Sequence, residues 1–227
     1  MSKKRKEPRK KNSDWQKTLS RVFIVVILFA CVVGFSLSTS FFSIFRTAET
    51  GDYVVVDYTL YYEDGFPIIS SDSYLVEDAY AQGLPVAYTN PLILQVGSLQ
   101  DETTIPVDVY HYYLGNTRYA LLDLELDSMS SDVEGMHVND IKRAELEFAP
   151  TLTYEMGAEE FDSIENLNFS DAEVGMLMFR KVYLTEDAGL DNQTEIYRPS
   201  VIIEKTNDTA TLRYGYALAE FKVSQIG

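Results

Sequence analysis

Side chains that could catalyse a reaction or bind a metal are few in this sequence. The two histidines, His111 and His137, are far apart, and neither stands in a His-x-x-x-His or His-x-Glu pattern. Cys31 is the one cysteine, so no disulfide can form within the chain and no cysteine cluster can hold a metal. The sequence therefore predicts no metal centre and no cofactor.

Motifs for nucleophilic or phosphate chemistry are also missing. The sequence contains no Gly-x-Ser-x-Gly elbow and no phosphate-binding loop. Its carboxylates are scattered, and a pair such as Glu159-Glu160 is typical of a solvated surface rather than of an acid–base couple. Tyrosine is abundant, with runs at Tyr61-Tyr62 and Tyr112-Tyr113. These rings are expected either to pack within a β domain or to form a surface for apolar peptide.

The N-terminal segment divides sharply by charge. Residues 1–21 carry nine basic and two acidic side chains, a net charge of about +7, whereas residues 22–45 carry none. A helix over 22–45 would be about 36 Å long, enough to cross a hydrocarbon core of about 30 Å. We therefore expect a transmembrane helix over 22–45 that contacts the lipid bilayer. The basic tail 1–21 would be cytoplasmic and the large domain extracytoplasmic. A cleaved signal peptide is the alternative, but the apolar run extends beyond a typical cleavage site.

The remainder of the chain is acidic. The whole sequence has a formal net charge of −16, so the part after residue 21 sums to about −23, given the tail's +7. Such a charge argues against nucleic acid and anionic lipid headgroups as partners, and favours solubility and basic partners. Asn168, Asn192 and Asn207 begin Asn-x-Ser/Thr triplets, which accept glycans where the source glycosylates surface proteins.

Residues from Asp52 onward show mainly the signature of strands. In 52–62, Val54, Val56, Tyr58 and Leu60 alternate with the side chains between them, and Glu63-Asp64-Gly65 forms a turn signal. Residues 118–127 fit either a helix or a strand, 70–90 look irregular, and 161–168 fit a short helical turn. Further strands are expected over 66–69, 91–97, 107–113, 141–148, 176–183, 200–205, 209–214 and 217–223. The predicted fold class is α+β, mostly antiparallel β.

The order of these segments resembles a known family. Gly51 to Thr59 with the turn Glu63-Asp64-Gly65, the strand 91–97, and Glu134-Gly135-Met136 leading to Ala149-Pro150 resemble FKBP-type peptidyl-prolyl isomerases. Val174-Gly175-Met176 and the paired segments before 217–223 resemble the SlyD-like branch, in which a β-rich chaperone flap is inserted before the last strand.

The resemblance implies a fold, a domain division and a site. The fold would be an FKBP-like sheet around a short helix, formed by residues 46–155 and 216–227, with an inserted β-rich flap over 156–215. The walls of its proline pocket would be Tyr58, Ile68, Leu92, Tyr154 and Phe221. The partners would be unfolded or proline-containing polypeptides. Isomerisation about a peptide bond, whose barrier is roughly 18–20 kcal/mol, needs no nucleophile, metal or cofactor.

Two departures leave the activity open. Ile68-Ile69 stand where the family usually has an apolar residue followed by Asp, and the family's Val-Ile-Pro-Gly-(Phe/Trp)-Glu pocket floor is not recognisable between Gly97 and Glu134. Three functions therefore remain: a membrane-anchored isomerase and chaperone for exported proteins, a non-catalytic polypeptide-binding module or subunit of a surface complex with the same fold, and an unrelated β-rich ectodomain.

Overall fold

A computed structural model describes residues 13–43, 46–62, 65–164, 167–182 and 196–227. The chain divides into two compact units, Met1–Phe45 and Arg46–Gly227, and each is described by itself. Residues 1–12 of the predicted tail and the triplet at Asn192 lie outside the described residues.

The first unit contains the helix α1, Ser13–Ser43. Among the residues that the structure describes, no helix has both the length and the apolarity that crossing a bilayer requires, so the predicted transmembrane helix over 22–45 is wrong. The extracytoplasmic location rested on this helix and stays a prediction.

The second unit is built on one mixed sheet. Its described residues form twelve strands in the order β7-β12-β1-β2-β3-β5-β6-β10-β11-β8, with β4 also beside β1 and β9 beside β10. All pairs are antiparallel except β2–β3 and β6–β10. The strands are β1 Tyr53–Tyr61, β2 Pro67–Ser70, β3 Ala87–Thr89, β4 Leu92–Gln95, β5 Thr104–His111, β6 Gly115–Leu122, β7 Ile141–Glu145, β8 Thr153–Gly157, β9 Leu177–Val182, β10 Ile196–Lys205, β11 Thr209–Arg213 and β12 Leu218–Ile226.

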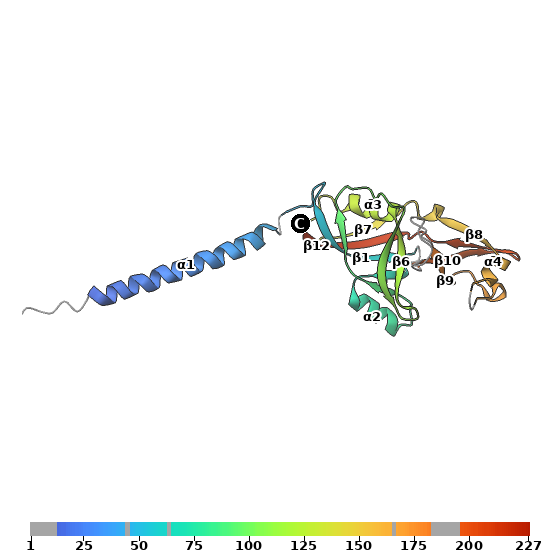
Figure 1. Cartoon of the computed structure of the whole chain (residues 1–227), viewed down its shortest axis with the longest axis horizontal. Helices are drawn as coiled ribbons and strands as arrows, with labels where there is room; N and C mark the ends of the chain where they lie inside the picture. Colours follow the sequence, from blue (N-terminus) through green and yellow to red (C-terminus); the bar gives the residue numbers. More distant parts are fainter. Residues whose placement is uncertain (1–12, 44–45, 63–64, 165–166, 183–195) are drawn as a thin grey trace, which may run out of the picture. The chain divides into compact units, whose positions relative to one another are not determined.

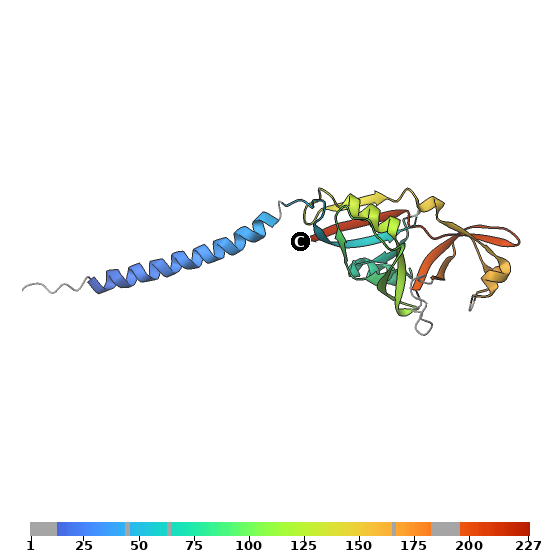
Figure 2. The same ribbon diagram turned by 45° about the horizontal axis from the view of Figure 1, so that its top comes forward.

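The sheet is strongly curled, as Figures 1 and 2 show, and few helices accompany it. The helices of this unit are α2 Ser73–Ala81, α3 Asp123–Asp132 and α4 Ala158–Asp162, with the 3-10 turns η1 Ala149–Thr151 and η2 Phe169–Asp171. The prediction of an α+β fold, with a sheet around one short helix, is therefore wrong. Strands β3, β5 and β6, only part of which was predicted, extend the sheet and link it directly to β10.

The irregular segment predicted over 70–90 is in fact ordered. Asp72 caps α2, because its carboxylate accepts hydrogen bonds from the amides of Tyr74 at 2.9 Å and Leu75 at 3.4 Å. Val76 and Ala79 of this helix form a small apolar cluster with Val86, which leads into β3. Helix α2 and strand β3 therefore replace the predicted loop.

Buried apolar residues gather in two larger clusters. The main core is formed by β1, β2, β12, the β5–β6 hairpin and α3, and includes Val54, Leu60, Leu121 and Met129. The second core is formed only by residues between 154 and 212, with Phe161, Phe169 and Ile202 at its centre. A separate inserted unit over 156–215 stays a prediction, and the second core is an observation in its favour.

Candidate functional site

The five predicted pocket residues do not form one pocket. Tyr58 and Phe221 face each other across β1 and β12, only 2% and 1% exposed, and Ile68 is equally buried. Leu92 is partly buried against the same main core. Tyr154 instead packs on the second core, where its hydroxyl donates a hydrogen bond to Glu160 at 2.7 Å.

Tyr58 and Phe221 border a hollow with a mixed lining, in which Tyr74, Leu75 and Ile141 lie beside charged and hydroxyl side chains. It has a volume of about 390 Å³ and its rim is formed by β1, β12 and the start of α2. The rings of Tyr58 and Phe221 are almost fully covered, so they present little apolar surface to it. A proline ring there would meet the exposed side chains of Tyr74 and Ile141 as well as the polar groups of Asp57, Ser71 and Asp72, and not the five predicted residues together.

The interior beside these residues is occupied by an ion pair. Arg198 on β10 and Glu125 on α3 are 2% and 0% exposed and meet through two hydrogen bonds, the Nη1–Oε2 bond measuring 2.9 Å. Arg198 also donates to the carbonyls of Ala120 and Tyr214, both at 2.7 Å. The amide of Leu122 donates to Glu125 at 2.9 Å. The charges are thus paired and solvated by protein groups, as buried charges must be.

Tyrosines surround this ion pair. The guanidinium of Arg198 lies 4.1 Å from the ring centre of Tyr216, and the rings of Tyr62 and Tyr216 lie 5.8 Å apart. The hydroxyls of Tyr62, Tyr119 and Tyr216 have no hydrogen-bond partner among the described residues. Burial raises the pKa of all three hydroxyls, so they stay neutral. This centre offers neither a free base nor a free acid, and its role is structural.

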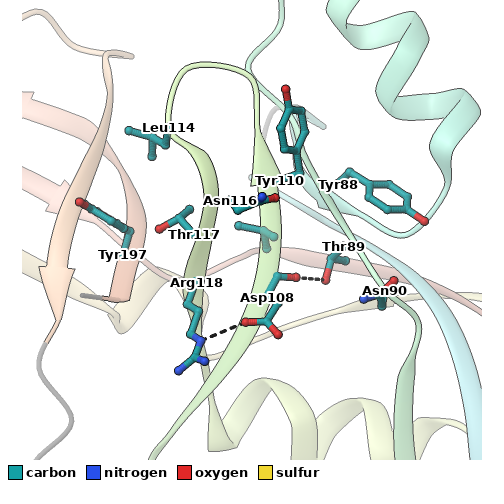
Figure 3. Close-up of a pocket in the computed structure, with 11 residues that line it drawn as sticks. Tyr88, Thr89, Asn90, Asp108, Tyr110, Leu114, Asn116, Thr117, Arg118 and Tyr197 are labelled. Carbon is teal, nitrogen blue, oxygen red and sulfur yellow. Dashed lines mark hydrogen bonds and ion pairs between the residues drawn. The ribbon is translucent and has the colours of Figure 1, made fainter. Parts of the chain in front are cut away.

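An open groove lies on another face of the domain. It has a volume of about 910 Å³ and lies over β3, β5 and β6, with Leu114 and Tyr197 at one end (Figure 3). Its lining combines aromatic, amide, hydroxyl and charged side chains: Tyr88, Thr89, Asn90, Asp108, Val109, Tyr110, Leu114, Asn116, Thr117, Arg118 and Tyr197.

Cross-strand pairing arranges the groove side chains in two rows. Tyr88 pairs with Tyr110, which pairs with Asn116, so two rings and an amide follow one another across three strands. In the next row Asp108 faces Arg118, and their side chains form an ion pair at 3.0 Å. Tyr110 is 48% exposed, so its ring is available to a partner. The groove thus presents apolar surface beside hydrogen-bonding groups.

One side of the groove is bordered by a strand edge. Strand β6 pairs with β5 along its whole length, but it pairs with β10 only at Tyr119, opposite Tyr197. On this outer side, the described part of the chain supplies no strand for Gly115 to Arg118. Backbone groups at such an edge are able to pair with another extended chain.

Sequence reasoning found only part of this site. The run Tyr112-Tyr113, suggested as a peptide surface, lies at the tip of the β5–β6 hairpin next to the groove, and both rings are exposed. Tyr88, Asp108 and Arg118 carried no signal of their own, because they come together only through the register of β3, β5 and β6. Among the described residues, no three metal-ligating side chains converge.

No family model matches this chain, and no curated protein shows significant similarity to it. The resemblance to FKBP-type isomerases therefore rests on the short motifs described above.

Proposed function

We propose that Arg46–Gly227 is a non-catalytic module that binds extended segments of polypeptide in the groove over β3, β5 and β6. The observation that carries this proposal is the open groove itself, in which two tyrosine rings and an amide lie near a strand edge for which the described residues supply no partner. The partners are unfolded polypeptides, including proline-containing ones.

The lining suits an extended chain for two reasons. Side chains of a strand alternate between its two faces, so every second one could lie against the rings of Tyr88 and Tyr110. Another stretch of the same polypeptide could pair its backbone with the outer edge of β6 between Gly115 and Arg118, because β6 lies on the far side of β5 from Tyr88. Binding through backbone groups and rings selects for extended conformation more than for sequence, as a folding helper or a scaffold subunit requires.

Binding is expected to depend on Tyr110. We expect Tyr110→Ala to weaken binding of a fluorescein-labelled peptide of alternating valine and threonine, with a lysine at each end, by about tenfold or more. Such a loss is typical of an aromatic anchor in an interface. Fluorescence anisotropy of the labelled peptide measures the change in Kd.

The matched control is Tyr53→Ala. Tyr53 is another strand tyrosine, 59% exposed, and does not line the groove. Its loss should leave the affinity unchanged. Equal effects of the two substitutions, or no binding of the peptide at all, would contradict the proposal.

Isomerase activity has less support. Catalysis would need a pocket that holds the proline ring and favours the twisted peptide bond, but Tyr58, Ile68 and Phe221 are packed in the main core and Tyr154 lies on the second core. We therefore expect no acceleration of cis-to-trans relaxation of an X-Pro peptide, a process that takes tens to hundreds of seconds unaided. A protease-free fluorescence assay at micromolar protein measures it, and clear acceleration would restore the isomerase prediction.

A further inference from the structure

His111 is buried at the tip of the β5–β6 hairpin, beside the groove. Its side chain is fully covered, and its Nδ1 atom accepts hydrogen bonds from the amides of Tyr113 and Leu114, both at 3.3 Å. Gly115, which pairs with His111, has a φ of 69° and closes the turn. The turn is therefore folded around a neutral imidazole whose proton is on Nε2, since Nδ1 must be an acceptor.

Among the residues that the structure describes, none beside His111 carries a charge that would balance a positive imidazole. Strand β9 contributes Phe179, whose ring centre lies 4.9 Å from the imidazole in an edge-on arrangement. The titratable groups that face it are the hydroxyl-bearing rings of Tyr113 and Tyr119, at 5.8 and 6.4 Å between ring centres, and both are neutral in acid. The segment before β3 contributes only the backbone carbonyl of Pro85.

We propose that protonation of His111 opens the tip of the β5–β6 hairpin and thereby weakens the binding of polypeptide in the groove. The effect on polypeptide binding rests on the proposed function, whereas the opening of the tip rests on the geometry of His111 alone.

The mechanism follows from the two hydrogen bonds. A proton on Nδ1 turns this acceptor into a donor that faces two amide donors, so both bonds to the turn are lost. A charged imidazole against Phe179 is also poorly solvated and must move toward water. Leu114 lines the groove and Tyr110 precedes His111, so their positions change with the turn.

The direction of the pH dependence follows from the burial of the ring. Burial lowers the pKa of His111 below its usual 6.5, and the carbonyl of Pro85 opposes this only in part. An opened or unfolded turn therefore binds the proton more readily than the closed one. The closed tip is fully stable above about pH 6.5 and loses stability as the pH falls toward the lowered pKa.

Two glutamine variants test the proposal in the full chain. His111→Gln keeps an acceptor at this position but cannot titrate, and His137→Gln removes the other, half-exposed histidine. For the alternating valine–threonine peptide, we expect wild-type affinity to fall about tenfold or more between about pH 7 and pH 5. His137→Gln should show the same fall, whereas His111→Gln should keep its affinity. An equal fall in His111→Gln would overturn the proposal.

A second measurement needs no peptide and no change at His111. In wild-type protein, the NMR signals of the Tyr113 and Leu114 amides should shift with the titration of His111. If those amides respond but the peptide binds at no pH, the proposed function fails and the pH-sensitive tip stands. If the peptide binds but the amide signals are insensitive to pH, the proposal about His111 fails and the proposed function stands.

Discussion

Replacing Glu125 by alanine is expected to lower the free energy of unfolding of the domain by about 3–5 kcal/mol. The substitution leaves the guanidinium of Arg198, which is 2% exposed, buried without its carboxylate. It also removes the acceptor for the amide of Leu122 at the start of α3. Urea denaturation followed by far-UV circular dichroism measures the loss, and the tyrosine signal in the near-UV reports on the surrounding rings.

An exposed ion pair provides the control. Asp108 and Arg118 meet at 3.0 Å, but their side chains are 79% and 44% exposed, so Asp108→Ala should cost at most about 1 kcal/mol. A double variant, Glu125→Leu with Arg198→Met, should recover part of the loss because no unpaired charge remains. If Glu125→Ala and Asp108→Ala lowered the free energy of unfolding equally, the buried ion pair would not be the element that joins α3 to β10.

The local pattern of the sequence was sufficient for much of the strand content. The alternation in 52–62 correctly predicted β1 and its buried face, because Val54, Val56, Tyr58 and Leu60 are all covered. Residues 118–127 fitted either a helix or a strand, and the structure contains both: β6 ends at Leu122 and α3 begins at Asp123. Period-two alternation and a helical start overlap there, so no single periodicity describes the segment.

Contacts between distant segments were not predictable in this way. Arg198 pairs with Glu125 across 73 residues, and in the sequence each is one of many scattered charges. The predicted pocket residues were separated for the same reason, since Tyr154, assigned by sequence to the FKBP-like part 46–155, packs instead on the second core. The groove depends on the register of three strands. Hydrophobic alternation constrains the register where a face is buried, but it leaves the register open where the face is exposed.

The ion pair also determines what should happen when the insert is removed. Residues 153–213 begin three residues before the predicted insert 156–215 and end two residues before its end. They are flanked by Leu152 and Tyr214, whose backbones are joined by a hydrogen bond of 3.0 Å. A short glycine linker can therefore close the chain without moving its ends. The excision removes Arg198, however, and leaves the carboxylate of Glu125 in the main core without a partner.

We therefore expect excision of 153–213 alone to abolish cooperative unfolding, and the same excision with Glu125→Gln to restore it. Glutamine carries no charge and keeps an acceptor for the amide of Leu122, so the cost of an unpaired buried carboxylate disappears. Urea denaturation of both proteins beside full-length Glu125→Gln makes the comparison. A cooperative transition after excision alone would show that the remaining core tolerates the carboxylate of Glu125 without Arg198. If neither excised protein unfolded cooperatively, Tyr197 and Val201 of β10, which pack on the main core, would be indispensable to that core. The twelve strands would then form one inseparable sheet.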